Sequence, residues 1–161
     1  MMIAGRVVEP GWPVRIGLLV LPMLALAAFV AVTRPPEPKR NVVATLGGRA
    51  FDLVVADTPQ LRARGLQGFP EPARAAGMLF VYDRPQEVTV AIKTLPYRID
   101  VAFIDARMRV VRTVSMQPEP FGIQRATSGV PVLYVVEARA GTLIADDVSV
   151  GTRFATAGEF E

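Results

Sequence analysis

The sequence of 161 residues contains no cysteine and no histidine. The missing cysteine excludes disulfides, thiol nucleophiles, cysteine metal sites and a lipid-modified N-terminal cysteine. The missing histidine removes the commonest general base near neutral pH and the commonest transition-metal ligand. A Ser-His-Asp triad within this chain is excluded for the same reason. We therefore expect no cofactor and no metal site.

Lysine is also scarce, because only two of the 18 basic residues are lysine. Five basic and two acidic side chains lie in residues 1–40, so residues 41–161 carry 13 of each sign. The positive net charge of the chain therefore belongs to its N-terminal part. A nucleic-acid-binding domain requires a basic face of its own, and we expect no nucleic-acid partner here.

One long apolar run, residues 16–32, contains no charged residue and continues to Thr33. Seventeen helical residues span roughly 25 Å, the short end of the range for a membrane helix. The run is interpreted as an uncleaved signal anchor or as a cleaved signal peptide. In the second case Arg6 and Arg15 form the basic region and Ala25-Leu26-Ala27 the cleavage site. The apolar run continues past that site to Val32, which favours the anchor over cleavage. A buried core helix is the third alternative.

The flanking segments then define the topology. Residues 1–15 form a cytoplasmic flank, and residues 16–33 attach the protein to the inner (cytoplasmic) membrane as a single-pass anchor. Residues 34–41 form a proline-rich linker, residues 42–155 a folded domain, and residues 156–161 a frayed tail. Because a single N-terminal segment with a basic flank usually acts as an export signal, we expect the domain to face the periplasm or exterior. Cleavage would release it into the periplasm.

Most of the domain is predicted to form short strands. Gly47-Gly48 indicates a hairpin turn, and Thr58-Pro59 indicates the start of a short helix that ends at Gly65. Residues 117–129 are predicted to form a long loop. The predicted strands are residues 42–46, 50–56, 78–82, 88–92, 99–104, 108–116 and 132–137, and Arg153-Phe154 is expected to close the sheet. The predicted fold is mainly β, a single sandwich or barrel of jelly-roll type with one short helix.

Several motifs in this order resemble the family called domain of unknown function 192. The resemblance covers about residues 44–154, and Gly77-Met78-Leu79-Phe80 matches the family's best-known short motif. The other matching pieces are residues 51–56 with Thr58, Arg62 with Gly65-Leu66 and Gly68, Ile99-Asp100 with Phe103-Ile104-Asp105, and residues 134–137 with Gly141. The resemblance implies a mainly β, often exported domain, with no established reaction, substrate or cofactor.

Some family positions differ in this chain. The family usually has a Trp-Met-Lys-Asn-Thr run before its Leu-Asp, and here the aligned residues 91–95 keep only the lysine, Lys93. The family's methionine after Gly-Leu is Gln67, and its aspartate after the late glycine is Thr152. A site that used the family's tryptophan or asparagine would be altered in this member.

Four polar residues are candidates for a ligand-binding site: Arg62, Lys93, Asp100 and Glu137. Lys93, the only lysine of the domain, provides a donor for an anionic group, or is an exposed strand-end lysine. Asp100 interrupts an apolar strand, so it needs a partner such as Lys93, Arg62 or Arg64. It otherwise acts as a structural ion pair or turn cap. Glu137 ends another apolar strand, where it belongs to the site or protects the sheet edge.

Three functions remain open from the sequence. The first is a tethered, non-enzymatic domain that binds a small polar ligand or an envelope component. The second is a carboxylate-based hydrolase acting on envelope glycans, which needs two carboxyl groups such as Asp100 and Glu137 about 5–9.5 Å apart. The third is a structural or assembly module of the envelope, with the loop around Phe121 docking a partner. Whether the protein is an enzyme is left open, with binding preferred.

Overall fold

The computed structural model describes residues 38, 40–93, 95–119 and 122–157. The predicted N-terminal flank, the hydrophobic segment and most of the linker lie outside these residues, as does Phe121. None of the helices that the structure describes is long and apolar enough to cross a membrane.

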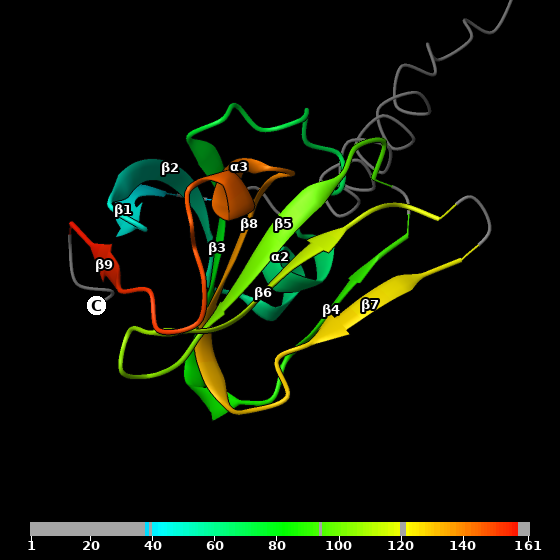
Figure 1. The fold of residues 1–161 in the computed structure, drawn as a ribbon. Coiled ribbons are helices and arrows are strands. Elements are labelled where there is room, and N and C mark those ends of the chain that lie inside the picture. The colour runs from blue at the N-terminus through cyan, green and yellow to red at the C-terminus, as the bar shows by residue number, and fades with distance from the viewer. Residues whose placement is uncertain (1–37, 39, 94, 120–121, 158–161) are drawn as a thin grey trace, which may run out of the picture. The chain divides into compact units, whose positions relative to one another are not determined.

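Seven strands form one mixed sheet in the order β6-β5-β8-β3-β2-β1-β9 (Figure 1). All neighbours are antiparallel except β2 and β3, which are parallel because α2 connects them across the sheet. The tight hairpin at Gly47-Gly48 joins β1 to β2, as predicted. The strands are β1 (Asn41–Leu46), β2 (Arg49–Ala56), β3 (Ala76–Gln86), β5 (Ile99–Ile104), β6 (Val110–Met116), β8 (Val132–Arg139) and β9 (Phe154–Thr156).

The sheet curls until its two ends meet. Arg109 forms an isolated bridge with Arg153. The Val110 N–H donates to the Thr152 carbonyl at 2.9 Å, and the Phe154 N–H donates to the Met108 carbonyl at 2.9 Å. These bonds join the start of β6 to the segment entering β9, so the predicted closure near Arg153-Phe154 is confirmed. The result is a mainly β fold built on one curled, half-barrel sheet.

The inner, concave face of this sheet forms one of two apolar clusters. Because successive side chains of a strand point to opposite faces, Phe51 and Leu53 of β2 enter this cluster while Val54 and Ala56 face the other way. The cluster also contains residues of every other strand of the sheet and of the segment after Gly141, including Ala44, Leu46, Leu79, Ala102, Ile104, Val110, Val136, Ala138, Leu143, Val148 and Phe154.

A second sheet covers the outer face. β4 (Thr89–Ile92) and β7 (Gln124–Thr127) pair as a two-stranded antiparallel sheet, separate from the main one (Figure 1). Val90 and Ile92 pack with Phe80, Val101 and Phe103 in the outer apolar cluster. The expectation that residues 117–129 form only a loop was wrong, because β7 lies within them and supplies the partner strand of β4.

Two short helices are described where one was expected. α2 (Pro59–Arg64) begins and ends as predicted: the Thr58 hydroxyl accepts the Leu61 N–H at 3.2 Å, and Gly65 follows the last turn. α3 (Thr142–Ala145) is a single turn that the sequence analysis did not predict. Its first two residues are buried, and α2 places its C-terminal end near the outer cluster, where Leu61 is buried.

Candidate functional site

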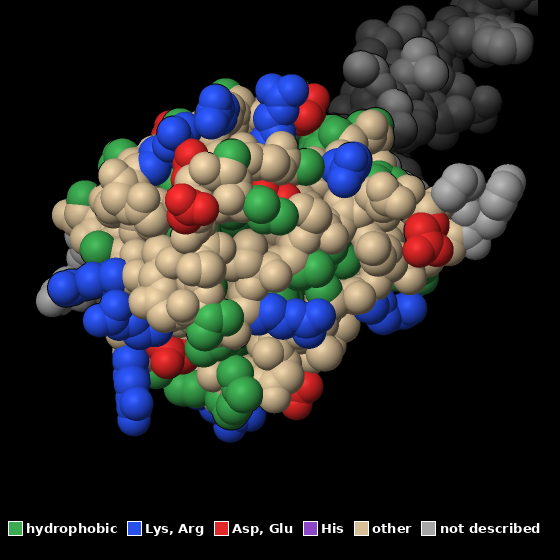
Figure 2. Space-filling view, in the orientation of Figure 1, with side chains coloured by type: hydrophobic (Ala, Val, Ile, Leu, Met, Phe, Trp, Pro, Cys, Tyr) green, Lys and Arg blue, Asp and Glu red, His purple; other side chains and the backbone are tan. Residues whose placement is uncertain are grey.

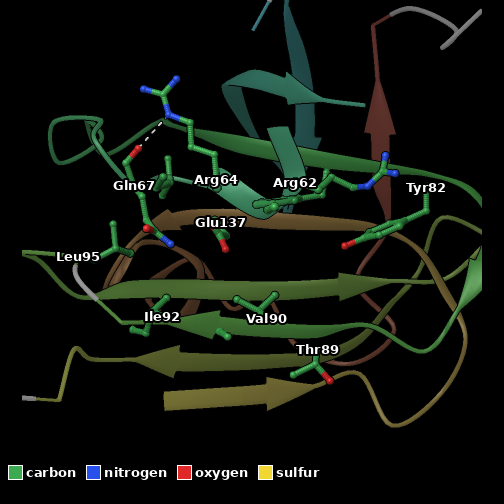
Figure 3. Close-up of a pocket in the computed structure, with 14 residues that line it drawn as sticks. Arg62, Arg64, Gln67, Tyr82, Thr89, Val90, Ile92, Leu95 and Glu137 are labelled. Atoms are coloured by element: carbon green, nitrogen blue, oxygen red, sulfur yellow. Dashed lines mark hydrogen bonds between the residues drawn. The ribbon is translucent and has the colours of Figure 1, made fainter. Parts of the chain in front are cut away.

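A cavity of about 200 Å³ lies on the outer side of the main sheet, between the end of α2 and the strand β4 (Figure 3). β3 and β8 form its floor, through Phe80, Tyr82 and Glu137. The exposed residues Gln67 and Thr89 also line it, so it opens to solvent. The remaining lining residues are Arg62, Ala63, Arg64, Gly65, Leu66, Val90, Ala91, Ile92 and Leu95.

Glu137 is the one carboxyl group among the residues that line this cavity. It lies on β8 opposite Met78 of β3 and Val101 of β5, in the middle of the sheet, and only 4% of it is exposed. Figure 3 shows its side chain in the space between the α2 end and β4. Within the described residues, no lysine or arginine lies within salt-bridge distance of this carboxylate.

Burial raises the pKa of Glu137 from 4.5 to about 7. A charged carboxylate is less stable away from water, so the protonated form is favoured in the folded protein. A hydrogen bond from the Leu66 backbone lowers this pKa, but by less than burial raises it. Glu137 therefore changes charge near neutral pH, at the floor of a cavity that opens to solvent.

Gly65 allows the chain to approach this carboxylate. Its φ of 53° and ψ of −141° lie in a region that L residues rarely adopt. A methyl group at this position would lie 3.4 Å from Oε2 of Glu137 and 3.5 Å from the Phe80 ring. The glycine thus serves two purposes: it ends α2, as the sequence indicated, and it leaves room for the Glu137 side chain and the cavity around it.

Arg62 forms one wall of the cavity and is held by its own contacts. Its Nη1 donates to the carbonyls of Asp57 and Val81, each at 2.7 Å, and its guanidinium lies 4.9 Å from the centre of the Tyr82 ring. The bond to Val81 attaches α2 to β3, and the bond to Asp57 joins α2 to the turn that precedes it. Burial raises the pKa of Tyr82. The charge of Arg62 lowers this pKa, and the charge of Glu137 raises it further.

The loop after α2 forms the opposite wall and is fixed by two neighbours. The Tyr97 hydroxyl lies within hydrogen-bond distance of the carbonyls of Leu66 and Phe69, at 3.2 and 3.1 Å. Arg64 donates from Nε to the Gln67 carbonyl at 3.1 Å and stacks 4.7 Å from the Phe69 ring centre. The backbone that faces Glu137 is therefore held in place by side chains from outside the loop.

The other two predicted site residues lie elsewhere. Asp100 pairs with Ala138, the residue after Glu137, so its side chain points to the inner face. Lys93 is exposed after the end of β4 and is not among the residues that line the cavity. Of the four candidates, the structure brings Arg62 and Glu137 together.

Asp100 has a structural partner set in place of the expected Lys93, Arg62 or Arg64. Its Oδ1 accepts the Ser115 hydroxyl, and its Oδ2 accepts the N–H groups of Leu143 and Ile144 at 3.1 and 3.4 Å. It thereby attaches α3 to the sheet. Because Asp100 and Glu137 point to opposite faces, they do not form the carboxylate pair that a glycoside hydrolase requires.

The chemistry available in the cavity is therefore limited to one carboxyl group, aromatic and aliphatic surface, backbone groups and the arginines of α2. Glu137 can accept a hydrogen bond or a cation when ionised and can donate a proton when neutral. Among the described residues, no group of three or more acidic side chains is placed to hold a metal ion.

Sequence reasoning missed three parts of this site: Gln67, Tyr82 and the strand β4 as its wall. Gln67 occupies a position where this chain differs from the family pattern, which was the available signal. Tyr82 and β4 carried no comparable signal, because their place depends on how distant strands pair.

Two solved structures share this fold. A protein from Sinorhizobium meliloti, described provisionally as a transcription regulator, is 28% identical with a TM-score of 0.67, over 77% of this chain and 99% of that chain. A protein of unknown function from Novosphingobium aromaticivorans is 22% identical with a TM-score of 0.67, over 75% of this chain and 89% of that chain.

No curated protein shows significant similarity to the chain. Residues 42–156 match the family DUF192, whose description reads "Uncharacterized ACR, COG1430". The match spans most of the chain and all the strands described above except the first residue of β1. The function of the protein is thus not established by its relatives, and the chain belongs to the DUF192 family.

Proposed function

We propose that this protein is a binding protein that takes a small polar ligand into the Glu137 cavity. The observation that carries the proposal is the carboxylate of Glu137, buried at a cavity floor with no cationic side chain at salt-bridge distance within the described residues. A buried carboxylate is unfavourable unless it is paired or hydrogen-bonded. Glu137 has a hydrogen bond from the Leu66 backbone, and a ligand that donates further hydrogen bonds or carries a positive charge would compensate the rest of the cost of its burial.

The size and lining of the cavity support a small ligand. Its volume is below the range of about 300–1,000 Å³ that is usual for drug-sized ligands. Phe80, Val90 and Ile92 provide apolar contact, while Glu137 and the exposed backbone provide polar contact. This combination of apolar walls with a few fixed polar groups is typical of small-molecule sites.

The test is a calorimetric thermal-unfolding screen of the full-length chain in mild detergent at pH 8, against sugars, amino acids, polyamines and short peptides. A ligand at a hundred times its Kd stabilises the folded state by about 2.7 kcal/mol. We expect at least one probe to raise the Tm of the protein, and we expect the effect to disappear in Ala63→Phe, which places a ring at the cavity rim. Ala63→Ser is the matched control and should behave as wild type.

The proposal is wrong if no probe raises the Tm, or if Ala63→Phe responds as wild type does.

Catalysis is less well supported than binding. A carboxyl group with a pKa near 7 suits general acid–base chemistry. However, the residues that line the cavity supply no second carboxyl group, cysteine or histidine to act with it.

We further propose that the domain acts outside the cytoplasm, attached to the inner membrane by residues 16–33. The support is the uncharged apolar run, its length and its basic flank. The absence of cysteine permits a clean test, because Val150→Cys, at an exposed position, would be the one thiol of the chain. We expect a membrane-impermeant maleimide to label it in intact spheroplasts. Labelling only after lysis would place the domain in the cytoplasm and reject the proposal.

Transcription regulation, the provisional description of the Sinorhizobium neighbour, is not extended to this chain. Residues 41–161 carry equal numbers of acidic and basic side chains. On the face shown in Figure 2, lysine and arginine side chains lie in several separate places, at the margin and within the face, with acidic ones among them. Binding to the phosphate backbone depends on a concentrated basic surface.

A further inference from the structure

The strand β4 has one hydrogen-bonded neighbour, β7, so its other edge is free of strand pairing among the described residues. The Ser128 N–H donates to the Val88 carbonyl at 2.8 Å, so these two residues form a hydrogen-bonded pair. In an antiparallel pair such pairs alternate with non-bonded ones. Val90 and Ile92 therefore bond to β7, while the N–H and C=O groups of Thr89 and Ala91 point away from it.

The strand that carries these groups borders the cavity. All four residues of β4 line it, as do six consecutive residues on the opposite wall, 62–67. No hydrogen bond to the backbone of Thr89 or Ala91 is present outside the β4–β7 ladder in the described part of the chain. An unpaired strand edge of this kind can accept an extended peptide as an additional strand.

We propose that the ligand of the Glu137 cavity is the amino-terminal end of an extended peptide, which pairs with the free edge of β4 and places its ammonium group on the Glu137 carboxylate. This inference rests on the proposed binding function and names the ligand class. The backbone edge accounts for the amide groups of the ligand, and the buried carboxylate accounts for its positive end. The small volume of the cavity matches the end of a chain, whose remainder extends past the exposed rim.

The arrangement selects an amine over other peptide groups. An acetylated amino terminus has no charge to pair with Glu137 and occupies more of the cavity. A hydrogen bond to a charged group contributes more than a neutral one. We therefore expect acetylation of the peptide to weaken binding by about tenfold or more.

The test is isothermal titration calorimetry of the full-length chain in detergent with Ala-Ala-Ala, its N-acetylated form and its form methylated at the first peptide nitrogen. Acetylation should weaken binding through the loss of the ammonium, and methylation through the loss of one N–H from the strand pairing. Equal affinity of the free and acetylated peptides would overturn the inference. Propylammonium and glucose are included as non-peptide probes.

Two protein variants separate the two contacts. Glu137→Gln should remove the preference for the free amine and leave the acetylated peptide unchanged. Ala91→Pro removes the N–H that points away from β7, and an edge-strand proline leaves the β4–β7 ladder intact. It should weaken all peptides, whereas Ala91→Val, the matched variant that keeps the N–H, should bind them more tightly than Ala91→Pro does. Thermal unfolding of each variant confirms that it is folded.

The pH profile gives an independent readout. Binding requires an ionised Glu137, whose pKa is about 7, and a protonated amine, whose pKa is about 7.7–8.0. The affinity should therefore be greatest between these values and decrease on either side. The other ionisable groups near the cavity are Arg62, Arg64, Tyr82 and Tyr97. Burial raises the pKa of both tyrosines, further from this window.

The outcomes distinguish the two proposals. If glucose or propylammonium binds in the cavity and no peptide does, the binding function stands and the peptide inference fails. If no probe binds, both fail. If the peptide binds equally to wild type and Glu137→Gln, the ammonium contact is refuted.

Discussion

Asp100 and Glu137 lie on neighbouring strands, β5 and β8, one position apart in register, and point to opposite faces of the same sheet. Both are buried, at 0% and 4% exposure. Asp100 accepts three hydrogen bonds, from Ser115, Leu143 and Ile144. Glu137 has a hydrogen bond from Leu66, a cavity in front of it and a raised pKa.

The difference shows that burial alone does not indicate whether a carboxylate belongs to a functional site. On the inner face, the protein itself provides every partner of Asp100, and the result is a rigid connection between sheet and α3. On the outer face, Glu137 has a hydrogen bond from the Leu66 backbone and faces a cavity. The first arrangement stabilises the fold, and the second retains a carboxyl group whose ionised form is unfavourable, which is the group that we propose a ligand contacts.

The largest expected effect is on the inner face. Asp100→Ala should lower the free energy of unfolding by about 3 kcal/mol, because it removes three hydrogen bonds and leaves the buried N–H of Leu143 without its acceptor. Urea denaturation of the full-length chain in detergent measures the change. Ser115→Ala removes one of the three bonds and should cost about 1 kcal/mol. A loss below 1 kcal/mol for Asp100→Ala would show that the hydrogen bonds of Asp100 do not stabilise the fold.

On the outer face, by contrast, removing the carboxylate charge of Glu137 is expected to raise the free energy of unfolding at neutral and higher pH. The folded-state pKa of Glu137, about 7, lies above its ordinary value of 4.5. The folded protein therefore binds the proton more tightly than the unfolded chain does. The contribution of Glu137 to stability is then fully favourable below pH 4.5 and is lost as the pH rises to 7. The difference between the two values corresponds to about 3 kcal/mol.

Glu137→Gln should remove this loss, so the variant should be more stable than wild type at pH 8, by up to about 3 kcal/mol, and similar to it at pH 4.5. Urea denaturation at the two pH values measures the difference. A variant that is less stable than wild type at pH 8 would show that the Glu137 carboxylate already has sufficient partners within the fold.

A smaller effect is expected at Gly65, which determines how closely the chain approaches Glu137. Gly65→Ala should destabilise the protein by about 1–3 kcal/mol, because alanine is strained at a φ of 53° and ψ of −141°. Its methyl group should also reduce ligand affinity by narrowing the cavity. Thermal unfolding and calorimetric titration check the two effects. Gly48→Ala is the matched control: its φ is also positive, at 79°, and a methyl group there would meet no atom within 4 Å. This control should lose stability without losing affinity.

The sequence predicted the elements whose signals are local. The Thr58-Pro59 cap, the Gly65 stop and the Gly47-Gly48 turn each depend on the conformation of a few adjacent residues. β5 was predicted with its observed limits because it is apolar on both faces. β7 was missed because Ala126 is its only buried residue, so it shows no clear alternation.

The site depended on information that is not local. Asp100 and Glu137 were expected to belong to one cluster, and each was correctly identified as an unusual charge at or within an apolar strand. Their faces depend on the register between β5 and β8, and a shift by one residue would have placed both on the same side. No pattern within either strand determines that register. The same limit applies to the free edge of β4. Which of its two edges is free depends on its pairing with β7, a strand that the sequence did not predict.

The smallest effect on stability is expected at Lys93, the predicted site residue that is exposed after the end of β4. Lys93→Ala should change the free energy of unfolding by less than about 0.5 kcal/mol, as is usual for an exposed residue without a structural contact. It should also leave the affinity for the ligand unchanged, because Lys93 does not line the cavity. Urea denaturation and calorimetric titration measure the two effects in Lys93→Ala and, for comparison, in Arg62→Ala. Arg62 binds the Val81 carbonyl of β3 and the Asp57 carbonyl just before α2, so its loss should lower both stability and affinity. A loss of affinity in Lys93→Ala comparable to that of Arg62→Ala would extend the site beyond the cavity. The selectivity for positive charge would then have to be explained by more than Glu137.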